Sequence, residues 1–196
     1  MTKLQPGNQN SVRIIAGTCR SRKINFPNAP GLRPTADRIR ETLFNWLRED
    51  ISGEACLDLF AGSGALGFEA LSREAGWVTF VDNNVVVKNA LLDNLRKLNF
   101  GNAEIHCGDA FDWIAHARKM DRKYGIIFLD PPFAANIILQ TCSKIAETEL
   151  LKPGCKIYIE TADELADELL PETWQKIKSK KAGAVKYYLF ESTRSI

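Results

Sequence analysis

Hydrophobic positions along the chain follow two alternating periods from residue 55 onward. Five short apolar runs predict buried strands, at residues 55–60, 77–82, 103–108, 125–130 and 156–161. The segments after them carry apolar residues three and four apart and predict helices, from the glycine-rich turn to residue 71 and over 85–98, 110–120, 136–150 and 163–170. Strands that alternate with helices of this length predict a parallel sheet with right-handed crossovers.

The pattern differs on either side of this alternation. Residues 12–26 predict two short strands around a basic turn, and residues 27–34 form a Pro/Gly connector. Thr35 is placed to cap a helix that continues to about residue 49. Residues 174–191 predict a hairpin around Ala182-Gly183. We therefore expect an α/β fold with a doubly wound, mostly parallel seven-stranded sheet, an antiparallel C-terminal hairpin and a small N-terminal β-hairpin extension.

Composition narrows the class of protein. Of the 196 residues, 45% are hydrophobic and 26% are charged, which is typical of a single globular domain. No apolar run approaches the roughly 20 residues that cross a bilayer, and the N-terminus lacks the apolar core of a signal peptide. The five cysteines form no CxxC pair, and neither histidine has a ligand partner at a useful spacing. We expect a cytoplasmic protein with reduced thiols and no metal site.

The net charge of +2 conceals an asymmetry. Residues 1–40 hold eight Lys/Arg and one Asp, whereas residues 41–196 hold 18 Lys/Arg and 23 Asp/Glu. A basic N-terminal arm on a mildly acidic body indicates a polyanionic partner, and the alternative is a solvated tail. The apolar alternation in VRIIAG and KINF restricts a loose, flexible N-terminus to residues 1–11.

A glycine-rich loop, DLFAGSGALG, follows the first strand of the alternation. Such a loop lets the backbone approach a ligand, and the following helix directs its N–H groups toward it. The spacing matches G-x-G-x-x-G, so an NAD-dependent oxidoreductase is one reading. Asp58 opposes it, because a carboxylate beside a pyrophosphate is repulsive. S-adenosylmethionine fits better, since it carries an ammonium and a sulfonium and has no phosphate.

The next strand ends on a further carboxylate, and another follows the strand after it. Asp82 follows Gly64 by 18 residues and can accept from both ribose hydroxyls. Asp109 can accept from the adenine amino group, with the backbone N–H of Ala110 facing the ring. Asp109 can equally be the N-cap of the following helix.

The fourth strand ends in FLDPPF, residues 128–133. Each proline keeps the residue before it extended and has no N–H of its own, so the Asp130 carboxylate and the Pro131 carbonyl form a rigid pair of acceptors. With the flat face of Phe133, they suit an amino group on an aromatic ring: adenine N6, cytosine N4 or guanine N2. Such a base has to be single-stranded or flipped out of a duplex. The structural alternative is a Pro-stiffened strand end whose Asp caps a helix.

These motifs together resemble a known family. DLFAGSGALG, FVD, GDAF and LDPPF, in this order, resemble the amino-group branch of the class I S-adenosylmethionine-dependent methyltransferases, which have a Rossmann-like fold. RIIAG…RSRKI and GLRPTADRIRETLFNWL make the chain similar to the bacterial small-subunit ribosomal RNA guanine-N2 methyltransferases of the RsmD type. The resemblance covers residues 12–191.

The resemblance implies methylation of one guanine N2 in 16S rRNA, within the small ribosomal subunit or its assembly intermediate. It implies a catalytic motif formed by Asp130, Pro131, Pro132 and Phe133. It implies cofactor contacts from the three loops described above, namely Asp58, Phe60, Ala61, Gly62, Ser63, Gly64, Asp82, Asn83, Asp109 and Ala110. Two positions depart from the family pattern: Ser21 stands where glycine is common, and Asp82 where Glu is common.

The resemblance divides the chain into a basic hairpin and connector for RNA binding, residues 12–34, and a catalytic domain, residues 35–196. The candidate phosphate contacts are basic residues of the arm and of the next helix: Arg13, Arg20, Arg22, Lys23, Arg33, Arg38 and Arg40. Arg38 can instead pair with Glu41 or Asp37, and Trp46 at helical spacing favours a core position. The rival readings are an adenine or cytosine amino methyltransferase of RNA or DNA, and a non-catalytic RNA-binding factor. A monomer is the default.

Overall fold

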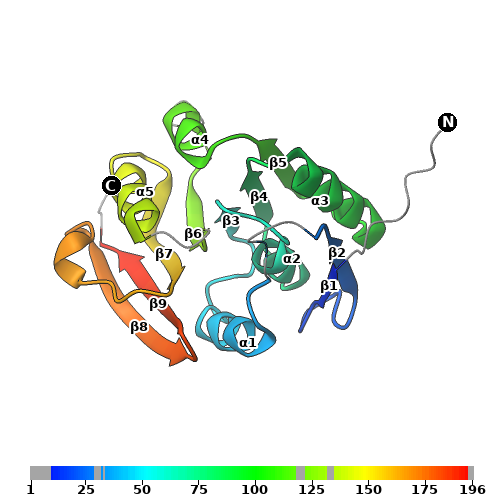
Figure 1. Cartoon of the computed structure of the whole chain (residues 1–196), viewed down its shortest axis with the longest axis horizontal. Coiled ribbons are helices and arrows are strands. Elements are labelled where there is room, and N and C mark those ends of the chain that lie inside the picture. The colour runs from blue at the N-terminus through cyan, green and yellow to red at the C-terminus, as the bar shows by residue number, and fades with distance from the viewer. Residues whose placement is uncertain (1–9, 29–31, 33, 118–121, 132–134, 194–196) are drawn as a thin grey trace.

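The computed structural model describes residues 10–28, 32, 34–117, 122–131 and 135–193. Its centre is a seven-stranded sheet in the order β5-β4-β3-β6-β7-β9-β8 (Figure 1). The strands are β3 (Ala55–Asp58), β4 (Trp77–Asp82), β5 (Ala103–Cys107), β6 (Tyr124–Leu129), β7 (Leu151–Thr161), β8 (Trp174–Ala182) and β9 (Val185–Ser192). The first five are parallel, while β9 runs antiparallel to β7 and β8. The predicted sheet and C-terminal hairpin are confirmed.

Helices cover both faces of the sheet because the buried strands are apolar on both sides. In β6, Ile126 and Phe128 pack into one core and Ile127 and Leu129 into the other. The first core lies under α1 (Asp37–Trp46), α2 (Ala65–Ser72) and α3 (Val85–Leu98). The second lies under α4 (Ala110–Ala117) and α5 (Ala135–Ala146). None of the helices in the described part of the chain is long and apolar enough to cross a membrane.

The N-terminal hairpin packs onto the same body. Its strands β1 (Asn10–Arg13) and β2 (Lys23–Phe26) are antiparallel, and Val12, Ile24 and Phe26 join the core beneath α1–α3. In the turn between them, Ser21 has φ 66°, a left-handed conformation that glycine adopts more readily, and its N–H donates to the carbonyl of Ile14 at 2.8 Å. The hairpin is therefore a docked element of the fold.

Two predictions about segment 147–170 need correction. The boundary between α5 and β7 differs from the prediction: the helix expected to reach residue 150 ends at Ala146, and the strand expected to begin at residue 156 begins at Leu151. The predicted helix over 163–170 is wrong, because the segment forms only a short 3-10 turn, η1 (Asp167–Leu169). A helix would place Leu165 and Leu169 on one face. Instead Leu165 and Leu170 are buried while Leu169 is 59% exposed.

Candidate active site

One cavity of about 470 Å³ opens at the carboxyl ends of the parallel strands. It lies where strand order reverses between β3 and β6, the usual ligand position in a doubly wound sheet. Its lining includes Gly62 of the glycine-rich loop together with Asp130 and Pro131 of the LDPPF segment. The glycine-rich loop, expected to bind the cofactor, and the start of the LDPPF segment, expected to bind the target amino group, therefore lie in one cavity. Pro132 and Phe133 lie outside the described residues.

In the glycine-rich loop, two glycines are closely packed against neighbouring side chains and the third is not. A Cβ on Gly64, which has φ +75°, would lie 2.6 Å from Leu91, and one on Gly67 would lie 2.2 Å from Phe80. A Cβ on Gly62 would meet nothing closer than 3.8 Å. Gly64 and Gly67 therefore allow α2 to pack closely, while Gly62 leaves its backbone accessible to a ligand.

Asp58 lies at the base of this loop and is only 3% exposed. Its Oδ2 accepts from the N–H of Gly67 at 3.0 Å. Burial raises the pKa of Asp58 to about 7; the hydrogen bond from Gly67 opposes this shift, and the charge of Asp82 adds to it. A cation placed in the cavity would stabilise the ionised form.

Asp82 at the end of β4 organises two neighbouring segments. Its Oδ2 accepts from the N–H of Gly62 and its Oδ1 from the N–H of Asn84, both at 2.9 Å. A carboxylate oxygen can accept more than one hydrogen bond, so Asp82 can still accept from a ligand hydroxyl. Asn83 lines the cavity beside it.

Asp109 precedes α4 and caps it. Its Oδ1 accepts from the N–H groups of Phe111 and Asp112 at 2.8 and 3.2 Å. The N-cap interpretation is confirmed. Asp109 also lines the cavity with Ala110, so the predicted contact with an adenine ring stays a prediction that the capping role does not oppose.

Asp130 has a carboxyl neighbour that the sequence analysis did not select. Glu160, near the end of β7, lines the same cavity and is 9% exposed. Burial raises the pKa of Asp130 well above its ordinary value, the charge of Glu160 raises it further, and a hydrogen bond from Thr35 opposes the shift. Burial likewise raises the pKa of Glu160, against hydrogen bonds from Tyr158 and Thr35. The site thus holds two adjacent carboxyl groups.

Thr35 does not cap α1, which corrects the prediction from the sequence. The N-cap of α1 is Ala36, without a side-chain hydrogen bond. The Thr35 hydroxyl instead donates to Oδ2 of Asp130 at 3.2 Å. The connector before α1 therefore reaches the cavity, which Pro34 and Ile39 also line.

The arginines of the arm separate into surface and buried groups. Arg13, Arg20, Arg22, Lys23 and Arg38 are exposed, and Arg33 lies outside the described residues. Asp37, one of the two carboxylates expected as possible partners of Arg38, forms an ion pair with Arg13 at 2.8 Å. Trp46 is half-buried and packs against the core, with 5.5 Å between its ring centroid and that of Tyr187, in line with the core position that its spacing favoured.

Arg40 is not on the surface, and its prediction as a phosphate contact is wrong. Its side chain is 1% exposed. It donates to the carbonyls of Thr35 at 3.2 Å and Arg13 at 2.9 Å, and it pairs with Asp37 at 2.7 Å and Glu69 at 3.5 Å. These partners use the guanidinium inside the fold, where an RNA phosphate has no access.

The site residues suit S-adenosylmethionine. The cavity falls within the 300–1,000 Å³ range usual for small-ligand sites. Asp58 and the open backbone at Gly62 would face its charged amino-acid end, and Asp82 its ribose. Among the residues that the structure describes, no group of three or more His, Cys, Asp or Glu is placed to hold a metal ion. All five cysteines are free, and Cys56, Cys142 and Cys155 are buried.

Comparison with known proteins also indicates a methyltransferase. A family profile described as Conserved hypothetical protein 95 matches residues 12–191. The protein named Ribosomal RNA small subunit methyltransferase D is 43% identical in Haemophilus influenzae, covering 98% of this chain and 100% of that protein. Its namesake in Escherichia coli K12 is 39% identical, covering 97% and 95%.

Solved structures share the fold. The Escherichia coli protein yhhF superposes with a TM-score of 0.84 at 39% identity and covers 95% of this chain and 100% of its own. The more distant SMU.776, complexed with SAH, gives a TM-score of 0.66 at 18% identity, covering 97% and 58%. Because the profile spans nearly the whole chain and the relatives align over nearly all of theirs, the chain belongs to the Conserved hypothetical protein 95 family, which it shares with the ribosomal RNA small subunit methyltransferases D.

Proposed function

We propose that this protein transfers a methyl group from S-adenosylmethionine to the exocyclic N2 of a guanine in 16S rRNA. The substrate is the small ribosomal subunit or its assembly intermediate, in the cytoplasm. The observation that carries the proposal is the single cavity lined by both the glycine-rich loop and the Asp130–Pro131 segment. Relatives that are 39–43% identical and named for small-subunit rRNA methylation supply the substrate class.

S-adenosylmethionine supplies an electrophilic methyl group on a positively charged sulfur. The protein supplies position and charge. Asp58, Gly62 and Asp82 hold the cofactor at the ends of β3 and β4, with Phe60, Ala61, Ser63 and Asn83 around it. Asp109 and Ala110 border the position proposed for the adenine ring.

Asp130 and the Pro131 carbonyl hold the two N–H groups of the target amino group. This grip turns the nitrogen lone pair toward the methyl group, about 3 Å away and in line with the departing sulfur. Asp130 stabilises the positive charge that develops on the nitrogen and accepts its proton. The raised pKa of Asp130 suits this role, because it makes the carboxylate a stronger base than an exposed aspartate.

The test compares the wild-type protein with Asp130→Ala, using cofactor labelled in its methyl group. Unmethylated small subunits, naked 16S rRNA and DNA are the substrates. We expect label in N2-methylguanine for the wild type, no turnover for Asp130→Ala, and the same affinity of both for S-adenosylmethionine. Label in adenine or cytosine, or in DNA alone, would replace guanine N2 with the corresponding amino group. Unimpaired turnover by Asp130→Ala would remove the assigned site.

The exposed basic residues of the N-terminal hairpin are proposed to contact RNA phosphates. Arg20, Arg22 and Lys23 lie on its turn and second strand, and Arg38 follows on α1. Each phosphate contact releases counterions, so binding through these residues has to weaken as salt rises. Arg40 has no part in this surface.

A further inference from the structure

We infer that Glu160 recognises the N1–H of guanine beside the reacting N2, and that this contact makes the site select guanine over other amino-bearing bases. The inference rests on the proposed function and assigns a specificity-determining residue to the same cavity. The methyl transfer itself does not require Glu160, because Asp130 and Pro131 already bind both N–H groups of the target nitrogen.

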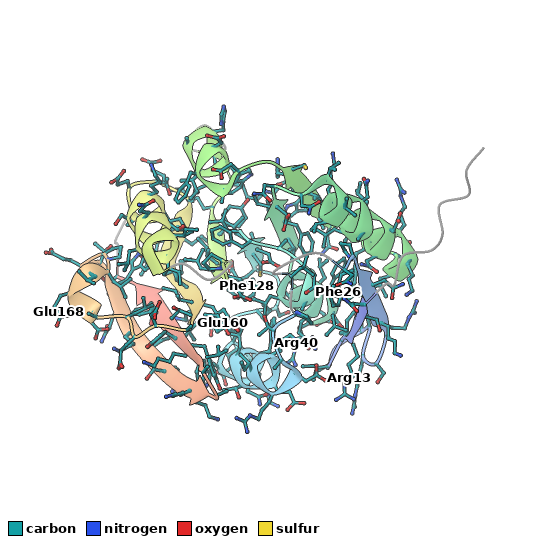
Figure 2. All side chains as sticks on the ribbon, viewed as in Figure 1. Arg13, Phe26, Arg40, Phe128, Glu160 and Glu168 are labelled. Carbon is teal, nitrogen blue, oxygen red and sulfur yellow. The ribbon has the colours of Figure 1, made fainter. Side chains whose placement is uncertain are left out.

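The position of Glu160 supports this role. In Figure 2 its side chain lies toward the centre of the molecule, whereas Glu168 lies at the periphery. β7 is the neighbour of β6 in the sheet, so Glu160 and Asp130 approach the cavity from adjacent strands. The Thr35 hydroxyl donates its one proton to Asp130 at 3.2 Å and also lies close enough to Glu160 to lower its pKa, which places the two carboxyl groups within reach of one side chain. Two acceptors this close match two neighbouring donors on one base.

The Glu160 carboxylate is oriented but not saturated. The Tyr158 hydroxyl donates to its Oε2 at 2.9 Å. An ionised carboxylate offers about four acceptor positions, and the hydroxyls of Tyr158 and Thr35 fill at most two of them. Acceptor positions therefore remain for a ligand.

The charge balance around the two carboxyl groups also favours a ligand that donates hydrogen bonds. Among the residues that the structure describes, neither Asp130 nor Glu160 has an arginine or lysine within ion-pair distance. Burial opposes the ionisation of both groups and raises the pKa of each, and the charge of Glu160 raises the pKa of Asp130 further. A ligand that brings several N–H donors removes part of this cost, whereas a ligand that brings acceptors adds to it.

Guanine presents the required donors in a row. Its N2 amino group lies beside N1–H, so the edge offers three N–H donors. In adenine the N6 amino group lies beside N1, and in cytosine the N4 amino group lies beside N3, and both ring nitrogens are acceptors. A carboxylate that faces such an acceptor is left unpaired and repelled. Sites built to pair with a substrate N–H reject analogues that lack it by large factors, up to about 10⁴–10⁵.

The structural alternative is that Glu160 serves only as the hydrogen-bond partner of Tyr158. Glu160→Gln separates the two roles, because the amide oxygen still accepts from Tyr158 while the amide NH₂ can donate to a ring acceptor. The matched control is Glu168→Gln, the same chemical change at an exposed position on η1.

The experiment measures kcat/KM on reconstituted small subunits that carry either guanine or 2-aminopurine at the target position. 2-Aminopurine keeps the N2 amino group but has an acceptor at N1. We expect the wild type and Glu168→Gln to prefer guanine by at least about 100-fold, and Glu160→Gln to reduce this ratio to below about 10-fold. Affinity for S-adenosylmethionine and thermal stability, measured in parallel, establish that Glu160→Gln is folded and binds the cofactor.

The outcomes distinguish the inference from the function on which it rests. If the wild type methylates guanine and Glu160→Gln keeps the full preference over 2-aminopurine, the inference is overturned and the proposed function stands. If the wild type leaves guanine N2 unmethylated in every substrate, both are overturned. A preference that collapses in Glu160→Gln and persists in Glu168→Gln supports the inference.

Discussion

Binding of S-adenosylmethionine is expected to release a proton from Asp58. The pKa of this carboxyl is about 7 without a ligand, chiefly because it is buried. An ammonium and a sulfonium placed in the same cavity favour the ionised form and lower that pKa. If the bound cofactor keeps Asp58 ionised, binding releases about 0.9 proton at pH 6, about 0.5 at pH 7 and about 0.1 at pH 8. Affinity then weakens by up to about tenfold per unit as pH falls below 7.

Isothermal titration calorimetry in buffers of different ionisation enthalpy measures this proton release directly. Asp58→Asn keeps an acceptor for the N–H of Gly67 and removes the titrating group, so it is expected to lose the release. 5′-Methylthioadenosine has neither cationic group and is expected to release no proton from the wild type. An unchanged release in Asp58→Asn would show that another carboxyl group of the cavity with a raised pKa, Asp130 or Glu160, is responsible.

The same shift sets a stability cost in the absence of ligand. Because the folded pKa of Asp58 is raised above its ordinary value of 3.8, the folded protein binds more protons than the unfolded chain between pH 4 and 7. Protonated Asp58 therefore stabilises the folded protein fully below about pH 4, and this contribution is lost as pH rises through 7. The difference of about three units corresponds to about 4 kcal/mol in the free energy of unfolding. In urea unfolding, the free energy of unfolding of Asp58→Asn relative to the wild type is expected to be higher at pH 8 than at pH 5.

Three further predictions follow from single contacts. Arg40→Met leaves the fully buried Glu69 with fewer partners and is expected to lower the free energy of unfolding by about 3 kcal/mol in urea titrations; a change below 1 kcal/mol would contradict its structural role. Gly67→Ala places a methyl group 2.2 Å from Phe80, so we expect lower thermal stability and weaker binding of S-adenosylmethionine. Arg20→Ala is expected to reduce the salt dependence of RNA binding by about one unit of log–log slope, with binding of S-adenosylmethionine unchanged.

The sheet and the three aspartates of the site were predictable because both follow from the pattern of apolar and polar residues along the chain. Apolar runs that alternate with helical periods fix a parallel sheet, and parallel strands end at a common edge. Asp82 and Asp130 end two such runs and Asp58 lies two residues before the end of a third, so their meeting in one cavity follows from the sequence. Glu160 also lies near the end of a run, yet the acidic segment after it resembles a solvated charged stretch. Its role depends on β7 lying next to β6, a fact of strand order.

The prediction that Arg40 contacts RNA was wrong, although the sequence contained a pattern that indicates its burial. Arg40 stands three, four and seven residues before Leu43, Phe44 and Leu47, which places it on the buried stripe of α1. A positive charge in a basic arm favoured a surface position, but periodicity indicated burial. The partner that makes burial tolerable, Glu69, is 29 residues away on α2 and cannot be assigned from spacing alone.

The buried position of Arg40 changes the reading of the N-terminal arm. One guanidinium joins the carbonyl of Arg13 at the end of β1 to the carbonyl of Thr35 in the connector, and the Thr35 side chain in turn contacts Asp130. Glu69 on α2 holds the same guanidinium and also accepts from the hairpin N–H groups of Ile15 at 2.7 Å and Ala16 at 3.1 Å. The arm is therefore fixed relative to the carboxyl pair by hydrogen bonds within the protein. We expect an RNA bound along its exposed residues to meet a surface of set geometry, which would let the arm position a flipped base as well as add affinity.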